Sequence, residues 1–246
     1  VAGPTKKPLD GEGKLIADFI ANGGNLLWLA DPENAPGLDA VAKTLGVNWE
    51  KGVGILLESS ALGLPPFVYV TTQYPPNPVT KDFAENALFP LVRGLTTTPA
   101  NDFDARPLLT TGENAWLETG SLEGELALEK DRGDTQGPLT IGVTLTREFK
   151  PKDGEAKSQR VAVIGDSDFL NNSYVSQLGN GALGINLAQW LASRDAQLNI
   201  DVPKAQDRTL ELPAWGYILI YVVFAFLLPA GLLGFGVTRW VIRRRR

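Results

Sequence analysis

Helix-like and strand-like patterns of apolar residues alternate along the first 45 positions. Residues 11–22 carry apolar side chains at helical spacing and end at Gly23-Gly24, which predicts an amphipathic helix with a glycine stop. Residues 25–30 form a continuous apolar run, which is typical of a strand buried on both faces. A second helix is predicted at about 38–45. The alternation indicates an α/β fold with a mostly parallel sheet and flanking helices.

The rest of the soluble part repeats this pattern after a proline-rich interval. Residues 160–165 form a second apolar strand, and a helix is predicted within 179–193. Residues 122–136 and 150–159 are polar, so we expect the first to be exposed and the second to be a solvated loop or hairpin tip. Between these landmarks the sequence predicts shorter strands at 67–72, 88–95, 107–111 and 139–146.

A long uncharged segment near the C-terminus predicts a transmembrane helix. Residues 212–238 are 27 positions without a charge. A helix of that length spans roughly 40 Å, whereas the hydrocarbon core of a bilayer is about 30 Å thick. Trp215, Tyr217 and Tyr221 lie at one end and Trp240 at the other, as aromatic side chains do at the two headgroup levels.

The charges that flank this segment predict its orientation. Five of the last eight residues are arginines, and arginine-rich flanks stay in the cytoplasm. In a bacterium the preceding domain is then periplasmic and the helix lies in the inner membrane. We therefore predict an extracytoplasmic α/β domain at 1–205 that lacks its N-terminal part, a linker at 206–213, a transmembrane helix at 214–238 and a cytoplasmic tail at 239–246.

Small residues in the second half of the transmembrane segment suggest a contact with another helix. Ala230 and Gly234 have small-xxx-small spacing, and Gly231 lies beside them. We predict that these three positions face a membrane partner. The alternative is that glycine is common in membrane helices. Pro229 removes a helical hydrogen bond just before them and is expected to kink the helix.

Composition excludes several functions. The net charge is −5, and without the five arginines of the tail the remainder carries about −10, so nucleic-acid binding is not expected. The chain has neither histidine nor cysteine, which excludes a Ser-His-Asp triad, a Cys-His nucleophile and a zinc site that uses those ligands. It also lacks a phosphate-binding G-x-x-x-x-G-K-[ST] loop. We predict no enzymatic activity, no cofactor and no metal.

The remaining candidates for ligand binding are polar residues that follow the two buried strands. Asp166, Ser167 and Asp168 come directly after 160–165, and Asp31 comes directly after 25–30. The carboxyl ends of parallel strands are where open α/β sheets usually bind ligands, and carboxylates can hold Ca²⁺ or Mg²⁺ or bind a sugar. The favoured alternative is structural, because Asp and Ser often cap the turn that follows.

Several segments together resemble a known family. They are, in order along the chain, VAGPTKKPLDGEGKLIADFIANGGNLLWLADP, NPVTKDF, RVAVIGDSDFLNN and GINLAQWLA, followed by the apolar helix with its arginine tail. This order resembles the GldG-type auxiliary subunits of bacterial ABC transport systems, which were first associated with gliding motility. The resemblance implies an α/β unit similar to amidotransferase-like or Rossmann-like folds and to an intraflagellar-transport subunit domain. It also implies a partner permease and a cytoplasmic ATPase.

Two functions therefore remain at this point. The first is a non-enzymatic extracytoplasmic subunit of an ABC transporter, whose helix packs on the permease within the lipid bilayer. The alternative is a membrane-tethered periplasmic module that binds or hydrolyses a glycan, or binds a cation, through carboxylates alone. Hydrolysis needs two carboxyl groups that face each other across a cleft, about 5 to 9.5 Å apart, which neighbouring positions on one turn rarely provide.

Overall fold

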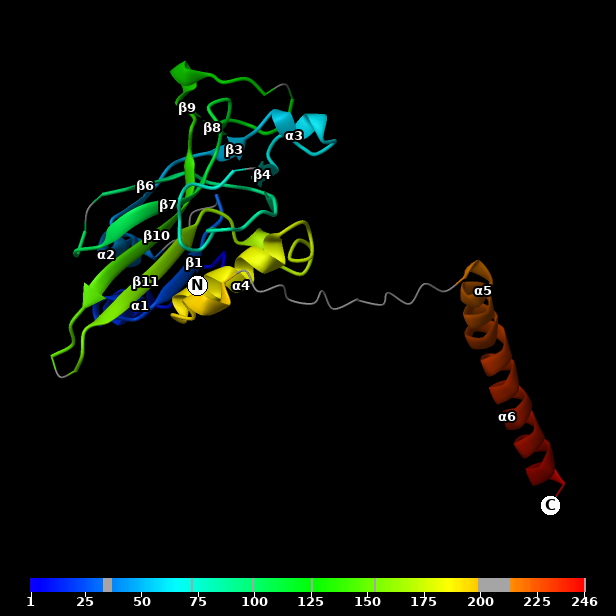
Figure 1. Ribbon diagram of the computed structural model, residues 1–246. Helices are drawn as coiled ribbons and strands as arrows, with labels where there is room; N and C mark the ends of the chain where they lie inside the picture. The colour runs from blue at the N-terminus through cyan, green and yellow to red at the C-terminus, as the bar shows by residue number, and fades with distance from the viewer. Residues whose placement is uncertain are drawn as a thin grey trace. The chain divides into compact units, whose positions relative to one another are not determined.

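The computed structural model describes residues 1–32, 37–71, 73–98, 100–124, 126–152, 154–198 and 213–245. The chain divides into two compact units (Figure 1). We call Val1–Asp201 the α/β unit and Val202–Arg246 the helical unit. Each is described by itself.

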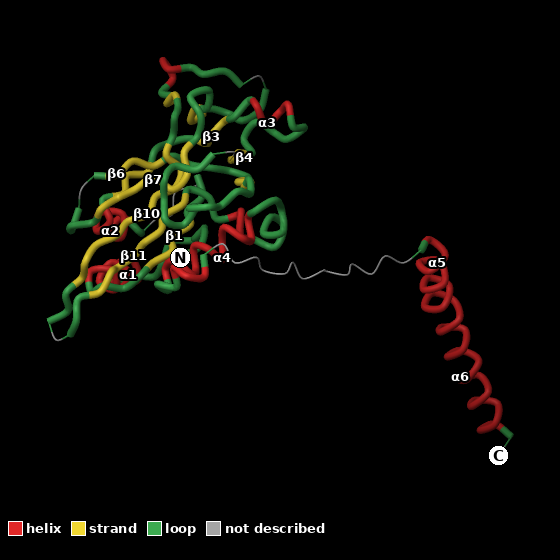
Figure 2. The backbone as a smooth tube through the Cα atoms, in the orientation of Figure 1, coloured by secondary structure: helices red, strands yellow, loops and turns green. Residues whose placement is uncertain are grey.

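A four-stranded sheet forms the centre of the α/β unit, in the order β1-β11-β10-β7 (Figure 2). Strand β1 (Leu26–Leu29) is parallel to β11 (Lys157–Ile164), with Leu29 opposite Ile164. Strand β10 (Thr140–Phe149) is antiparallel to β11 and also to β7 (Asp104–Thr110). The sheet is therefore mixed, and the expectation of a mostly parallel sheet is corrected.

The short connection between β10 and β11 explains why these two strands are antiparallel. Only seven positions separate the end of β10 at Phe149 from the start of β11 at Lys157, and a connection this short can only reverse the chain. The sequence identified this segment as a loop or hairpin tip, but its polar composition does not specify the direction of pairing. On the other side, Ala2 forms a parallel bridge with Leu29, so the first residues extend the parallel half along β1.

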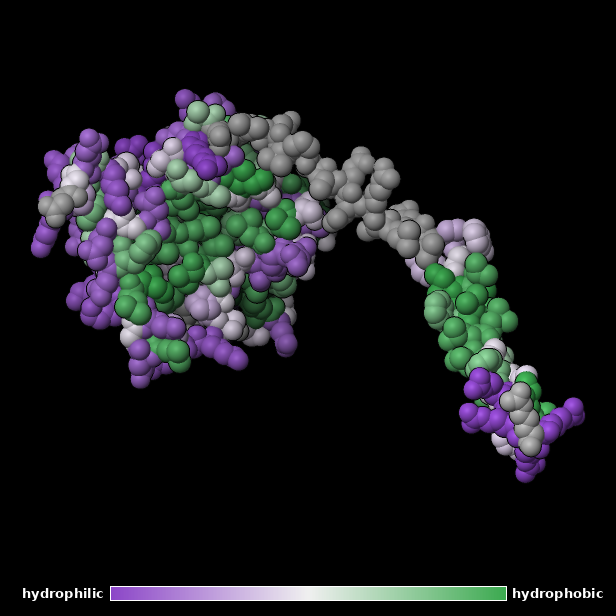
Figure 3. Space-filling model, turned by 90° about the horizontal axis from the view of Figure 1, so that it is seen from below, coloured by the Kyte–Doolittle hydropathy of each residue, from purple (hydrophilic) through white to green (hydrophobic). Residues whose placement is uncertain are grey.

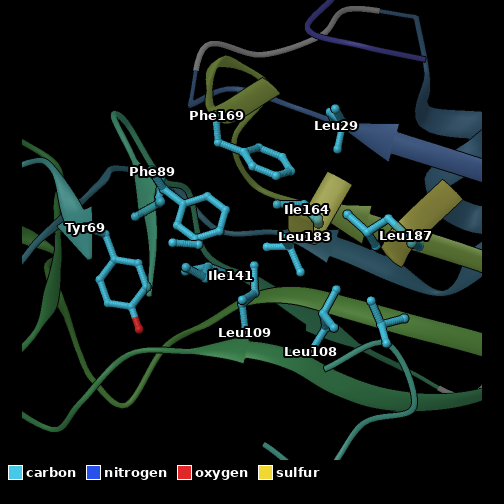
Figure 4. Packing of buried hydrophobic residues seen from close by; sticks show 14 of the residues in the cluster. Leu29, Tyr69, Phe89, Leu108, Leu109, Ile141, Ile164, Phe169, Leu183 and Leu187 are labelled. Carbon is cyan, nitrogen blue, oxygen red and sulfur yellow. The ribbon is translucent and has the colours of Figure 1, made fainter. Parts of the chain in front are cut away.

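Alternate residues of β11 contribute to different cores. Val161 and Val163 belong to the cluster that includes Ile20 of α1 (Glu12–Ala21) and Val41 of α2 (Asp39–Leu45). Ala162 and Ile164 belong to the other cluster, with Leu183 and Leu187 of α4 (Asn180–Leu191) and the aromatic rings of Phe89 and Phe169 (Figure 4). This two-sided burial explains why both parallel strands are continuous apolar runs.

Small sheets of two or three short strands surround the central sheet. The predicted strand 88–95 is two strands, because Pro90 cannot donate to a ladder and ends the first of them. A short helix α3 (Glu58–Ala61) and three 3₁₀ turns, η1 (Lys130–Arg132), η2 (Asp168–Leu170) and η3 (Asp195–Gln197), complete the unit. Two strand pairs are formed by β2 (Val47–Trp49) with β6 (Leu95–Thr97) and by β4 (Tyr69–Thr71) with β5 (Ala87–Phe89). A three-stranded sheet has the order β3 (Val53–Ile55), β8 (Trp116–Glu118) and β9 (Thr135–Gln136).

The helical unit contains one continuous helix in three parts. They are α5 (Ala214–Val222), a π-helical turn η4 (Val223–Leu227) and α6 (Leu228–Arg244). Residues Trp215–Arg244 are long and apolar enough to cross a membrane by length and composition. In Figure 3 apolar side chains cover the body of this helix and hydrophilic ones gather at its end. Pro229 lacks the N–H that would bond to the Ala225 carbonyl, and Ala225 lies in the π turn, where the helix absorbs that loss.

Candidate functional site

The parallel pairing of β1 and β11 brings the predicted polar residues together. The Ala30 amide donates to the Ile164 carbonyl at 2.9 Å, so the two strands end side by side. Beyond them, the Asp31 carboxylate accepts two hydrogen bonds from Ser167, one from its amide at 2.7 Å and one from its hydroxyl at 2.8 Å. Asp31 therefore ties the end of β1 to the loop that follows β11.

Gly3 makes this junction possible from a third chain segment. Its φ is +43°, and an added Cβ would lie 2.2 Å from the Ser167 hydroxyl oxygen and 2.6 Å from an Asp31 carboxylate oxygen. Only glycine fits here without displacing these two side chains, and its positive φ is one that other residues rarely adopt. Three segments that are far apart in sequence thus meet at this edge of the sheet.

Asp166 is fully buried beneath this junction. Its carboxylate accepts the Phe169 amide at 3.1 Å and the Leu91 amide at 3.3 Å. Burial raises the pKa of Asp166 to about 7, the nearby Asp31 charge also raises it, and the backbone donors oppose the change. The bond from Phe169 is the geometry that the capping alternative requires, since it occupies an amide at the start of η2.

Asp168 differs from the other two carboxylates because it is partly exposed. The only hydrogen bond to its side chain in the described structure comes from the Asn171 amide group, at 3.0 Å. Among the described residues no three acidic, histidine or cysteine side chains are grouped so that they could hold a metal ion. The arrangement can fix the loop, and the Asp168 carboxylate keeps one oxygen available to a ligand. Ligand binding at Asp31, Asp166, Ser167 or Asp168 stays a prediction.

Arg93 is a residue of this edge that the sequence reasoning missed. It is only 4% exposed, its amide donates to the Gly165 carbonyl at 2.8 Å, and its Nη1 donates to the Asp31 carbonyl at 3.1 Å. Its guanidinium lies over the Trp49 ring, 4.5 Å from the centroid. Burial lowers the pKa of Arg93. The available signal was a single arginine within the apolar segment 87–95.

The predicted membrane contact lies in the helical unit. Ala230, Gly231 and Gly234 are exposed on α6, and an added Cβ at either glycine meets no atom within 4 Å. Ala230 and Gly234 are one turn apart and share a face. This surface can accept a closely packed helix, and its role stays a prediction.

Comparison with known proteins identifies the family. Residues 1–199 match the family of ABC transport auxiliary components described as "ABC-type uncharacterized transport system". No curated protein matches the chain. The solved structure of the mmIFT52 N-terminal domain is similar in fold, with a TM-score of 0.52 and 14% identity over 78% of this chain and 75% of that chain. Because the family match covers most of the sequence, this chain belongs to the family of auxiliary components of ABC-type transport systems.

Proposed function

We propose that this chain is a non-enzymatic, GldG-type accessory subunit of a bacterial ABC transporter, such as those associated with gliding motility. The observation that carries the proposal is the order of parts: a unit matched to the auxiliary family over residues 1–199, followed by an apolar helix at Trp215–Arg244. The helix anchors the chain in the inner membrane, and the α/β unit acts in the periplasm.

The arginines at the end of α6 support this orientation. Arg239, Arg243, Arg244 and Arg245 follow the apolar part of the helix, whereas the α/β unit that precedes it is acidic. Retention of arginine-rich flanks in the cytoplasm places the C-terminus inside. The α/β unit then has access to the periplasmic face of a permease, and a partner ATPase lies on the cytoplasmic side.

A close helix contact is the proposed means of association with the permease. Apolar burial gives little net attraction between helices in lipid, so they associate through packing of small surfaces. The face formed by Ala230 and Gly234, with Gly231 beside it, is such a surface. In this proposal the α/β unit contributes shape and contacts rather than chemistry.

The orientation is tested with reporter fusions in the full chain. A reporter that is active only in the periplasm is inserted after Lys152, in the exposed hairpin between β10 and β11, or fused after Arg246. We expect activity from the first fusion and none from the second. Activity only from the C-terminal fusion would place the α/β unit in the cytoplasm and contradict the proposal.

A further inference from the structure

A pocket of about 870 Å³ opens next to Arg93 in the α/β unit. Helix α2, strand β2 and the segment that carries Arg93 contribute its walls. The indole rings of Trp28 and Trp49 meet edge to face there, with centroids 5.2 Å apart. The pocket thus combines an aromatic wall with a buried cation.

Two buried donors in this wall have no acceptor in the part of the chain that the structure describes. Neither Nε of Arg93 nor Nε1 of Trp28 has a hydrogen-bond partner among the described residues. Within the same ranges, no carboxylate oxygen lies within 4.0 Å of the Arg93 guanidinium, although that side chain is buried. Buried charges and buried N–H groups are normally paired, because water no longer solvates them. The Arg93 guanidinium bonds through Nη1 to the Asp31 carbonyl and feels the Asp31 charge, but its Nε keeps an open donor in the pocket wall, where an anion is expected.

The charges around the opening limit what that anion can be. Lys43 and Lys51 are exposed cations on the lining, and Asp39 and Glu50 oppose them. With Arg93 included, the lining carries one net positive charge, which matches a monoanion better than a polyanion. Guanidinium groups bind planar carboxylates through two parallel N–H bonds, and the indoles offer surface for an apolar or aromatic group.

We propose that the pocket binds an organic monocarboxylate, with its carboxylate at Arg93 and its apolar part against Trp49. The carboxylate belongs to a small free acid or to the C-terminus of a peptide, which present the same chemistry. This inference is independent of the association with a transporter.

Calorimetric titration of the full chain in detergent tests the proposal. Sodium benzoate probes a free aromatic acid and N-acetyl-phenylalanine probes a peptide terminus, with N-acetyl-phenylalanine amide and inorganic phosphate as comparisons at constant ionic strength. We expect one or both carboxylates to bind, and the amide and phosphate not to bind. Heat from benzoate alone assigns the free acid, and heat from N-acetyl-phenylalanine assigns the peptide terminus. Absence of binding by both carboxylates, or preference for phosphate, would overturn the proposal.

Substitutions in the pocket lining test whether the carboxylate binds beside Arg93. Arg93→Lys keeps the positive charge but removes the two parallel N–H donors of the guanidinium, so it should weaken carboxylate binding about tenfold. Should that variant fail to fold, two substitutions at the opening carry the test: Lys51→Gln should weaken binding and Glu50→Gln should strengthen it, each by about threefold. Lys152→Gln makes the same charge change in the distant hairpin and serves as the control. Binding that is equal in all variants would show that the carboxylate does not occupy this pocket.

Discussion

The buried carboxyl group of Asp166 links the stability of the α/β unit to pH. Its pKa in the folded chain is about 7, whereas the ordinary value is 3.8. Between these values the native state holds a proton that the unfolded chain has released, so the unfolded state binds fewer protons there. The contribution of Asp166 to the free energy of unfolding is full below about pH 4 and is lost as the pH rises to about 7. The shift corresponds to a loss of up to about 4 kcal/mol.

The variant Asp166→Asn should remove this dependence, because asparagine does not titrate. We expect the free energy of unfolding to fall less between about pH 5 and about pH 8 in the variant than in the natural chain. Urea unfolding of the full chain in detergent, followed by tryptophan fluorescence, measures the difference. Asp131→Asn changes an exposed carboxylate and should keep the natural slope. Identical slopes in the natural chain and in Asp166→Asn would contradict the assigned pKa.

At the same scale, the sequence anticipated some of the site and missed the rest. The positions of Asp31 and Asp166 after apolar strands were sufficient to place each of them at the carboxyl end of a strand, and the pairing of β1 with β11 brings them together. Their partners were not predictable, because the bonds to Ser167 and Leu91 depend on how distant segments meet. Arg93 was missed since no local pattern tells a buried arginine from an exposed one.

At the scale of elements, the spacing of apolar residues predicted which helices and strands are present better than it predicted how the strands pair. Helix α1 at Glu12–Ala21, strand β1 at Leu26–Leu29 and helix α2 at Asp39–Leu45 lie within a residue of the predicted ranges, because apolar spacing and glycine stops are local signals. The direction of β10 was not predictable in this way. An apolar run is the same whether its neighbour is parallel or antiparallel, and the length of the connection decides.

The small-residue face of α6 can be tested as an element. Gly234→Leu adds bulk on the proposed contact face, and we expect it to reduce the amount of permease that co-purifies with the chain. Gly236→Leu is the matched control, because two residues further along a helix the same change points to nearly the opposite side. An added Cβ at Gly236 also meets no atom within 4 Å, so neither variant disturbs the chain itself. Equal retention of permease by both variants would show that the Gly234 face does not form the contact.

At the scale of the whole molecule, a folded α/β unit is followed along the chain by an apolar helix with a basic end. Length, charge and the absence of histidine and cysteine were sufficient to predict the helix and to exclude several chemistries. The ordered segments along the chain indicated the auxiliary family, which the match over residues 1–199 confirms. The pocket beside Arg93 was not predictable, because it depends on tertiary contacts between β1, α2, β2 and the segment after β5.

The central claim is that this chain works as a subunit of an ABC transporter. Its most direct test is purification of the tagged full chain from native membranes in mild detergent, with mass spectrometry of the proteins that accompany it. We expect an ABC permease and its ATPase in constant ratio to the chain, with both retained through gel filtration. A chain that elutes alone from membranes in which the permease and ATPase are intact would contradict the account.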